Sequence, residues 1–205
     1  MKGNPTVRLR SVVSGFVLGA ATALLGGHAL SQDHGEMDQA AMERMMELAE
    51  QLAKPGEAHQ KLDFFTGEWE TATTVMGRPA EHGTQTIKWI LGGRYLQSTV
   101  TGMLMGQSFE GLGLMGYDNY KKKYTSVWCD NQSTTLLTSE GLADQTGNVI
   151  TMYGTMDEWL DGTHDKAVKY VYRILDCDTY EFEIHDLGIV PGETKVITMT
   201  ATRKK

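Results

Sequence analysis

The sequence predicts an all-β fold, an antiparallel up-and-down β-barrel of about ten strands with an N-terminal helical extension. Three observations predict this fold. Beyond residue 66, apolar and polar residues alternate with the period of strands that have one face in a core. Turn residues recur regularly, and no helical stretch lies between the strands, so neighbouring strands are joined by hairpins. A meander of this size loses its exposed edges by closing on itself.

Residues 1–31 have the pattern of a secretory signal peptide, with basic residues ahead of an uncharged run over 11–27. Small residues follow the run, and we expect cleavage after Ala29 or Ser31. The alternative is an uncleaved membrane anchor. It is disfavoured because the run is rich in Gly, Ala and Ser and short for a span of about 20 apolar residues. We therefore expect a periplasmic or secreted protein that has no membrane contact after cleavage.

Composition restricts the class of partner. The formal net charge is −7, and removal of residues 1–31 takes away three basic residues and no acidic one, which leaves −10. This charge excludes the concentrated positive field that nucleic-acid binding requires. Cys129 and Cys177 both remain after cleavage. In an oxidising compartment they either pair or stay as separate thiols, and the sequence leaves both possibilities open.

Residues 32–66 form a predicted helical lead. Strong helix formers fill residues 38–53, Pro55-Gly56 ends that helix, and a short helical turn follows over 57–65. An apolar stripe with helical spacing runs along the longer helix. It consists of Met42, Met45, Met46, Ala49, Leu52 and Ala53. Together with His34 and Met37, its thioethers are a candidate cuprous copper site, but a packing surface is the interpretation we favour.

Residues 67–205 form the predicted barrel domain. Alternation is clearest over 168–174 and 180–185, and turn sequences such as Asp161-Gly162 separate the strands. The expected strands are 67–76, 84–91, 94–103, 108–117, 122–130, 133–142, 149–157, 166–175, 179–187 and 194–203.

Several motifs of this domain occur in a recognisable order and spacing. They are Gly67-Glu68-Trp69, residues 89–96 (WILGGRYL), residues 109–119 (FEGLGLMGYDN) and Trp128-Cys129-Asp130. Over about residues 57–203 the chain resembles the DUF1579 family, a set of bacterial proteins of unknown function. The resemblance implies a lipocalin-like or calycin-like barrel, and it brings no established activity.

The same resemblance implies one structural contact. In the broader superfamily, a Gly-x-Trp on the first strand packs against a basic side chain from the last strand. Gly67 and Trp69 match the first half of this pattern, and Arg203 matches the second. The expected contact is a guanidinium over an indole face that closes one end of the barrel.

Aromatic residues on the predicted strands are the candidate ligand-binding residues. A barrel of this size can hold one small molecule, or its side chains can fill a solid core. Alternation indicates which residues face inward, but not whether space is left between them. Arg94 either offers a guanidinium to a carboxylate inside the barrel or is a surface residue beside a turn. The candidates are Trp89, Arg94, Tyr95, Tyr117, Trp128, Tyr153 and Tyr172.

Motifs of known catalytic chemistry are missing from the sequence, which contains no Gly-x-Ser-x-Gly and no His-Glu-x-x-His. Gly111 and Gly113 alternate within a strand, which favours a bend in the wall or a close approach over a nucleotide site. His185 is a conceivable axial ligand for haem, but its register with Glu181 and Glu183 favours a solvated residue. We therefore assign no catalytic, metal or cofactor residue and leave enzymatic activity open.

Two functions are compatible with these sequence features. The first is an exported protein that binds a small hydrophobic or amphipathic ligand inside the barrel. The alternative is a structural or interaction module with a solid barrel, whose Met-rich helix docks a partner or a second copy to form a homo-oligomer.

Overall fold

The structure, a computed structural model, describes residues 38–158, 161–189 and 193–205. The chain divides into two units, residues 1–43 and 44–205. The predicted signal peptide lies outside the described residues, as do His34 and Met37. No helix within the described ranges is both long and apolar enough to cross a membrane.

Helical segments precede the barrel, as the sequence predicts. The longest of them has no buried residue, whereas the two short ones bury His59, Leu62 and Phe65. The segments are α1 (Gln39–Ala53), α2 (Glu57–Gln60) and the 3₁₀ helix η1 (Lys61–Phe65). The end of α1 is tied to the barrel because the Asn119 side-chain amide donates to the carbonyls of Leu52 and Lys54, both at 2.8 Å.

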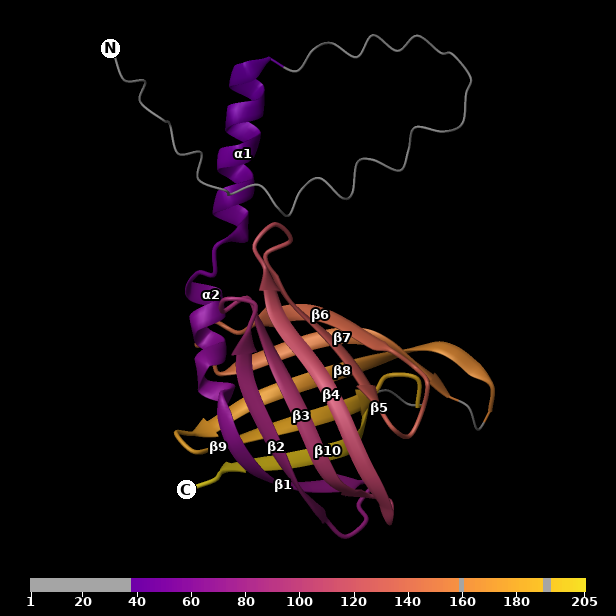
Figure 1. Cartoon of the computed structure of the whole chain (residues 1–205). Helices are drawn as coiled ribbons and strands as arrows, with labels where there is room; N and C mark the ends of the chain where they lie inside the picture. The colour runs from indigo at the N-terminus through magenta and orange to yellow at the C-terminus, as the bar shows by residue number, and fades with distance from the viewer. Residues whose placement is uncertain (1–37, 159–160, 190–192) are drawn as a thin grey trace, which may run out of the picture. The chain divides into compact units, whose positions relative to one another are not determined.

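Ten antiparallel strands follow and close into a barrel, which confirms the predicted fold (Figure 1). Each strand pairs with its neighbours in the sequence, and β1 also pairs with β10, where Trp69 lies opposite Arg203. The strands are β1 (Gly67–Val75), β2 (Glu81–Ile90), β3 (Tyr95–Leu104), β4 (Gln107–Asp118), β5 (Lys123–Asp130), β6 (Leu137–Ala143), β7 (Val149–Glu158), β8 (Thr163–Asp176), β9 (Thr179–Asp186) and β10 (Thr194–Arg203).

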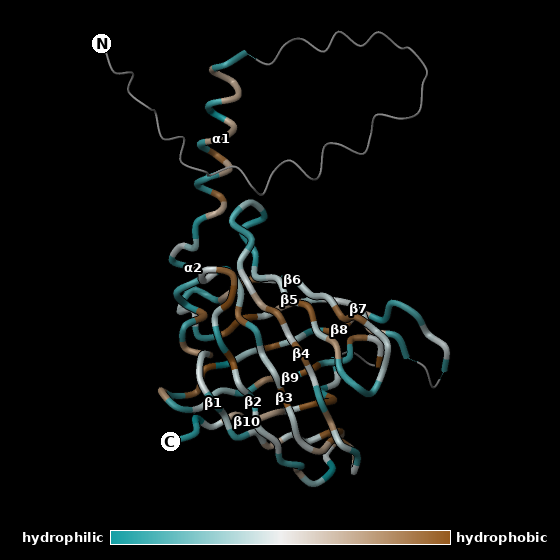
Figure 2. The backbone as a smooth tube through the Cα atoms, viewed as in Figure 1, coloured by the Kyte–Doolittle hydropathy of each residue, from teal (hydrophilic) through white to brown (hydrophobic). Residues whose placement is uncertain are grey.

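Side chains alternate between the interior and the outer face of the barrel, because successive residues of a strand point to opposite sides. Figure 2 shows the corresponding changes between hydrophobic and hydrophilic residues along the strands. The buried core gathers at the end where the chain enters β1. There, Leu62 and Phe65 of η1 pack with Trp69 and Tyr180, and we call this the packed end.

Arg203 closes the packed end. Its guanidinium carbon lies 4.2 Å from the centre of the Trp69 ring, which is the contact expected from the Gly-x-Trp pattern. The same guanidinium donates to the carbonyls of Thr66 at 2.7 Å and Phe64 at 2.8 Å. A Cβ atom on Gly67, which has a φ of 121°, would lie 2.9 Å from Arg203 Nη1. Glycine therefore suits this position both in backbone conformation and in space.

Candidate functional site

The barrel contains a partly open cavity of about 260 Å³ between the packed end and the opposite strand ends. Its wall is largely apolar, with side chains such as Ile87, Val100, Met115, Phe182 and Met199. The volume is close to the lower limit of small-molecule sites, about 300 Å³. The sequence left two alternatives, a barrel with a cavity and a barrel filled by side chains. In the structure, side chains fill the packed end and a cavity remains beyond it.

Space remains because inward positions on several strands carry small side chains. Ser98, Ser126 and Ser139 line one wall, and the larger Tyr170 and Tyr172 of β8 line another. A barrel layer built only from large side chains would fill this volume.

Trp128 lies flat against β4 inside the barrel because two glycines leave room for its ring. A Cβ atom on Gly111 would lie 2.2 Å from Trp128 Cζ2, and one on Gly113 would lie 3.0 Å from Cε3. The sequence predicted that another group approaches the backbone closely at Gly111 and Gly113, and that group is the indole of Trp128. Phe109 stacks on the same ring at a centroid distance of 6.3 Å, and the indole Nε1 donates to Asp130 Oδ2 at 2.9 Å.

A chain of hydrogen bonds crosses the barrel on the side of the packed end. The Tyr180 hydroxyl donates to Gln85 Oε1, and Gln85 Nε2 donates to Ser98 Oγ at 2.7 Å. Tyr180 and Gln85 are both buried, so each hydrogen bond satisfies groups that water does not reach. This chain positions three strands relative to one another and forms a polar floor for the cavity.

The Tyr170 hydroxyl differs from these groups because it is buried without a hydrogen-bond partner among the described residues. Its ring lies parallel to that of Phe182, at an interplanar angle of 11°. Burial raises the pKa of Tyr170 above the usual value for a phenol, so the hydroxyl keeps its proton at neutral pH. A buried hydroxyl without a hydrogen-bond partner lowers the stability of the folded state by about 1–3 kcal/mol. An acceptor placed at the Tyr170 hydroxyl would recover this free energy.

The charged residues that line the cavity are carboxylates. Glu81 begins β2 and Asp130 ends β5, so both lie at the strand ends opposite the packed end. Glu81 Oε1 accepts a hydrogen bond from the Gly106 N–H at 2.7 Å. Among the lining residues that the structure describes, none is Lys or Arg. The lining also includes the imidazole of His82, which is exposed at the start of β2. The wall therefore offers no Lys or Arg to pair with a buried anion.

A lysine near these strand ends is already engaged by carboxylates. Lys166 Nζ lies 2.5 Å from Asp186 Oδ2 and 3.1 Å from Glu158 Oε2. Burial by itself would raise the pKa of Asp186, but the contact with Lys166 keeps that pKa below its ordinary value.

Four of the predicted ligand-binding residues can be compared directly with this cavity. Trp128 and Tyr172 line it. Trp89 instead packs against the buried core and donates from Nε1 to Asp63 Oδ1 of η1 at 2.7 Å. Tyr153 lies on the outer face with 55% of its surface exposed, because its neighbours Met152 and Gly154 take the inward positions of β7.

The other three predicted residues lie near the packed end. Arg94, Tyr95 and Tyr117 line a second hollow of about 310 Å³, together with His59. Arg94 donates to the Leu91 carbonyl at 3.0 Å, so its guanidinium serves a turn and not the barrel interior. Burial, followed by the nearby charge of Arg94, lowers the pKa of His59.

Most polar residues of the cavity are not among those predicted from the sequence, and they include Tyr170, Gln85 and Ser98. Tyr170 lies on the same inward face of β8 as Tyr172, so the alternation of apolar and polar residues already indicates that Tyr170 points into the barrel. Gln85 and Ser98 lie on inward positions of β2 and β3, but no local pattern indicates that they bond to each other.

Thiol and metal-ligating groups are dispersed in the structure. Cys129 and Cys177 are both free thiols, so the pairing that the sequence left open is not formed. Within the described ranges, no group of three or more His, Cys, Asp or Glu side chains is arranged to hold a metal ion.

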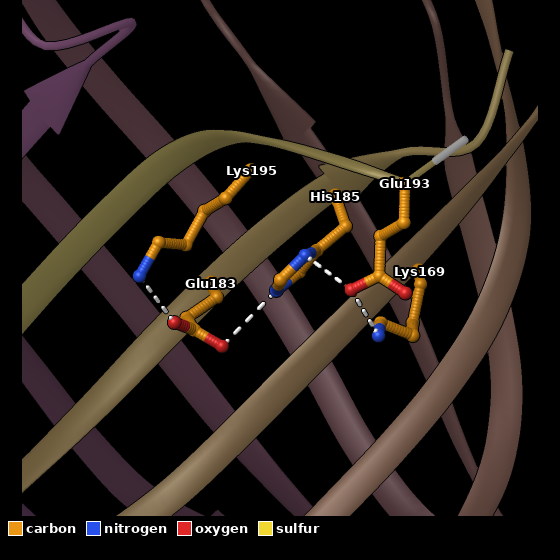
Figure 3. A network of polar contacts seen from close by, with 5 residues as sticks. All are labelled: Lys169, Glu183, His185, Glu193 and Lys195. Carbon is orange, nitrogen blue, oxygen red and sulfur yellow. Dashed lines mark hydrogen bonds and ion pairs between the residues drawn. The ribbon is translucent and has the colours of Figure 1, made fainter. Parts of the chain in front are cut away.

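His185 corrects one expectation. Only 12% of its side chain is exposed, although it lies on the outer face as predicted, because polar side chains of neighbouring segments surround it. Its Nε2 lies 3.0 Å from Glu183 Oε2, and its Nδ1 lies 2.7 Å from Glu193 Oε1 (Figure 3). Lys195 and Lys169 extend the network, at 2.7 Å from Glu183 and 2.5 Å from Glu193. His185 is not among the lining residues of the cavity.

This network predicts a dependence of stability on pH. Burial alone would raise the pKa of Glu183, but Lys195 and His185 keep it below its ordinary value of 4.5. The stabilisation from Glu183 is therefore complete above about pH 4.5 and is lost as the pH falls through the lower native pKa. We expect Glu183→Gln to flatten the acid side of the stability profile in urea unfolding between roughly pH 3 and 6. Glu181→Gln is the matched control on the same face of β9, and an equal flattening by both variants would contradict this assignment.

A family model described as a protein of unknown function, DUF1579, matches residues 54–203. No curated protein matches the chain.

Comparison of the structure finds other barrels. The crystal structure of Rv2717c from M. tuberculosis aligns with a TM-score of 0.53 and 16% identity, over 74% of this chain and 100% of that chain. A redesigned β-barrel, mFAP1 bound to DFHBI, aligns with a TM-score of 0.38 and 13% identity, over 72% of this chain and 100% of that chain. At these identities the first match shows a shared fold alone, and the second adds nothing to it.

Proposed function

The chain belongs to the DUF1579 family of proteins of unknown function, and from this premise we propose that it is an exported protein whose barrel binds a small, largely apolar molecule. The observation that carries this proposal is the cavity of about 260 Å³, with its apolar wall and few polar groups. Such a combination is typical of small-molecule sites. An apolar cavity of about 150 Å³ already accepts benzene, so a cavity of about 260 Å³ suits a molecule of two or three aromatic rings.

The binding proposal is tested with the uncharged dye N-phenyl-1-naphthylamine, whose fluorescence rises in an apolar site. We expect saturable enhancement with the purified protein, and native mass spectrometry should detect one dye per chain. Absence of both signals would overturn the proposal.

A pair of neighbouring substitutions locates the dye. Thr73 lines the cavity and Thr74, the next residue of β1, points to the outer face. We expect Thr73→Phe to weaken dye binding about tenfold or more, because the larger ring occupies part of the cavity. Thr74→Phe should leave the affinity within about twofold. Equal effects of the two variants in a fluorescence titration would place the dye outside the barrel.

Export is supported by the charge and hydropathy pattern of residues 1–31. We expect the full chain, produced in a bacterium with two membranes, to appear in the periplasmic fraction. Its intact mass should correspond to cleavage after Ala29 or Ser31. An uncleaved chain in the cytoplasmic fraction would contradict export.

A second candidate function is self-association through α1. None of the residues of this helix is buried, and large apolar side chains remain exposed along it. They are Met42, Met45, Met46 and Leu48. Such a face is self-complementary and suits a two-fold contact with a second copy. A dimer in light scattering that becomes a monomer when Met42, Met45 and Met46 are all replaced by Gln would support this function, and a monomeric wild type would exclude it.

A further inference from the structure

We propose that the ligand of the barrel is an uncharged molecule with one carbonyl-type acceptor, which accepts a hydrogen bond from the Tyr170 hydroxyl. This inference rests on the proposed function, because it assumes that the cavity holds a ligand. It goes further by naming the chemical class of the ligand and the side chain that recognises its polar group.

Tyr170 combines a buried, unpartnered hydroxyl with a position in the cavity wall. The residue lines the cavity, and 93% of it is buried, given its 7% exposure. Its hydroxyl is the one buried side-chain nitrogen or oxygen without a partner in the described part of the chain. Buried polar groups are nearly always paired, and a ligand in the cavity would bring an acceptor within reach of this hydroxyl.

Several other polar groups of the cavity wall are already hydrogen-bonded to the protein. Gln85 accepts from Tyr180 and donates to Ser98, and the hydroxyls of Ser126 and Ser139 lie 3.0 Å apart. Tyr170 therefore differs from these polar groups of the wall in having its hydrogen-bonding capacity unused. A phenolic hydroxyl carries one proton to donate, so the complementary group on the ligand is an acceptor.

The charge of the cavity wall restricts the ligand further. The described lining residues include the carboxylates of Glu81 and Asp130, but no Lys or Arg. The one imidazole of the described lining, His82, is exposed at the start of β2. A carboxylate buried deeper in the cavity would lose its hydration without a Lys or Arg partner, and the two acidic side chains would repel it. Burial also keeps Tyr170 in its neutral, donating form, because it raises the pKa of the phenol. A ketone, ester or amide carbonyl fits these conditions, whereas a fatty acid carboxylate does not.

The experiment uses three probes with one naphthalene skeleton. They are 2-acetylnaphthalene, which carries a neutral carbonyl, 2-isopropylnaphthalene, which has nearly the same shape without an acceptor, and 2-naphthoate, which is anionic at about pH 7.5. Dissociation constants are measured by calorimetry or by displacement of N-phenyl-1-naphthylamine, for the wild type and for Tyr170→Phe.

We expect Tyr170→Phe to weaken 2-acetylnaphthalene about tenfold and to change 2-isopropylnaphthalene by less than about twofold, because only the ketone loses a hydrogen bond. 2-Naphthoate should bind the wild type at least about tenfold more weakly than the ketone. Tyr153→Phe is the matched control, since it makes the same chemical change on the outer face of β7, away from the cavity. It should leave the affinity for the ketone within about twofold.

The outcomes separate the two proposals. If none of the probes binds, the proposed function fails and this inference fails with it. If the hydrocarbon binds but Tyr170→Phe leaves the ketone unaffected, the cavity is a binding site and the inference alone is overturned. This second result is also expected if a bound water satisfies the hydroxyl. Binding of 2-naphthoate as tight as that of the ketone would overturn the assignment of an uncharged ligand.

Discussion

Replacement of Arg203 by methionine is expected to lower the free energy of unfolding by about 3 kcal/mol. The guanidinium donates to the carbonyls of Thr66 and Phe64 and covers the faces of Trp69 and Phe64. Methionine keeps the apolar part of the side chain but leaves two carbonyls at the packed end without their donors. It also removes the cation from the indole face. The measurement is urea unfolding at neutral pH, followed by Trp fluorescence.

Two variants control for this effect. Lys204 is the next residue, and its ammonium lies 3.8 Å from Glu68 in an exposed pair. Lys204→Met should therefore change stability by less than about 0.5 kcal/mol. Arg203→Lys should recover only part of the loss, because one ammonium does not reproduce the two N–H donors and planar stack of a guanidinium. A loss for Arg203→Met that is no larger than that for Lys204→Met would contradict the role assigned to the guanidinium.

Tyr180→Phe and Tyr170→Phe are expected to change stability in opposite directions. Tyr180→Phe removes the donor from Gln85 Oε1 and should lower the free energy of unfolding by about 2 kcal/mol. Tyr170→Phe removes a buried hydroxyl that has no partner among the described residues and should raise it by about 1 kcal/mol in the ligand-free protein. The same chemical change is made in both, so they control for each other.

Thermal unfolding of the two variants, with and without 2-acetylnaphthalene, gives a second measurement. The ketone should raise the melting temperature of the wild type more than that of Tyr170→Phe, because a ligand that binds more tightly stabilises the folded state more. A destabilised Tyr170→Phe without ligand would show that its hydroxyl has a partner in the folded protein.

The fold could be predicted from the sequence because its signals are local. β8 and β9 alternate with period two, and turn residues separate each pair of strands, so the number and order of the strands follow from short windows. The contact between Trp69 and Arg203 joins the first and last strands, and its prediction depended instead on the resemblance of Gly-x-Trp to a known pattern.

The candidate site was less predictable because alternation gives the face of a residue but not its depth along the barrel. Trp89 and Trp128 are both aromatic strand residues, but the first lies near η1 and the second lines the cavity. His185 has the polar register of a solvated residue, and it is covered by Glu193, which lies beyond the end of β9. Whether a volume stays empty depends on side chains from many strands at once, and no short window contains that information.

The seam between β1 and β10 also determines the order in which the barrel can form. The bond between Arg203 and Phe64 joins positions 139 apart, so this closure follows synthesis of almost the whole chain. Until then, β1 has an unpaired edge of backbone donors and acceptors, which is a template for association with other chains. Contacts between such distant positions also slow folding. Before β10 pairs with β1, the folding chain therefore has strands whose edge backbone groups are unpaired. A chaperone that covers those edges would raise the yield of closed barrels.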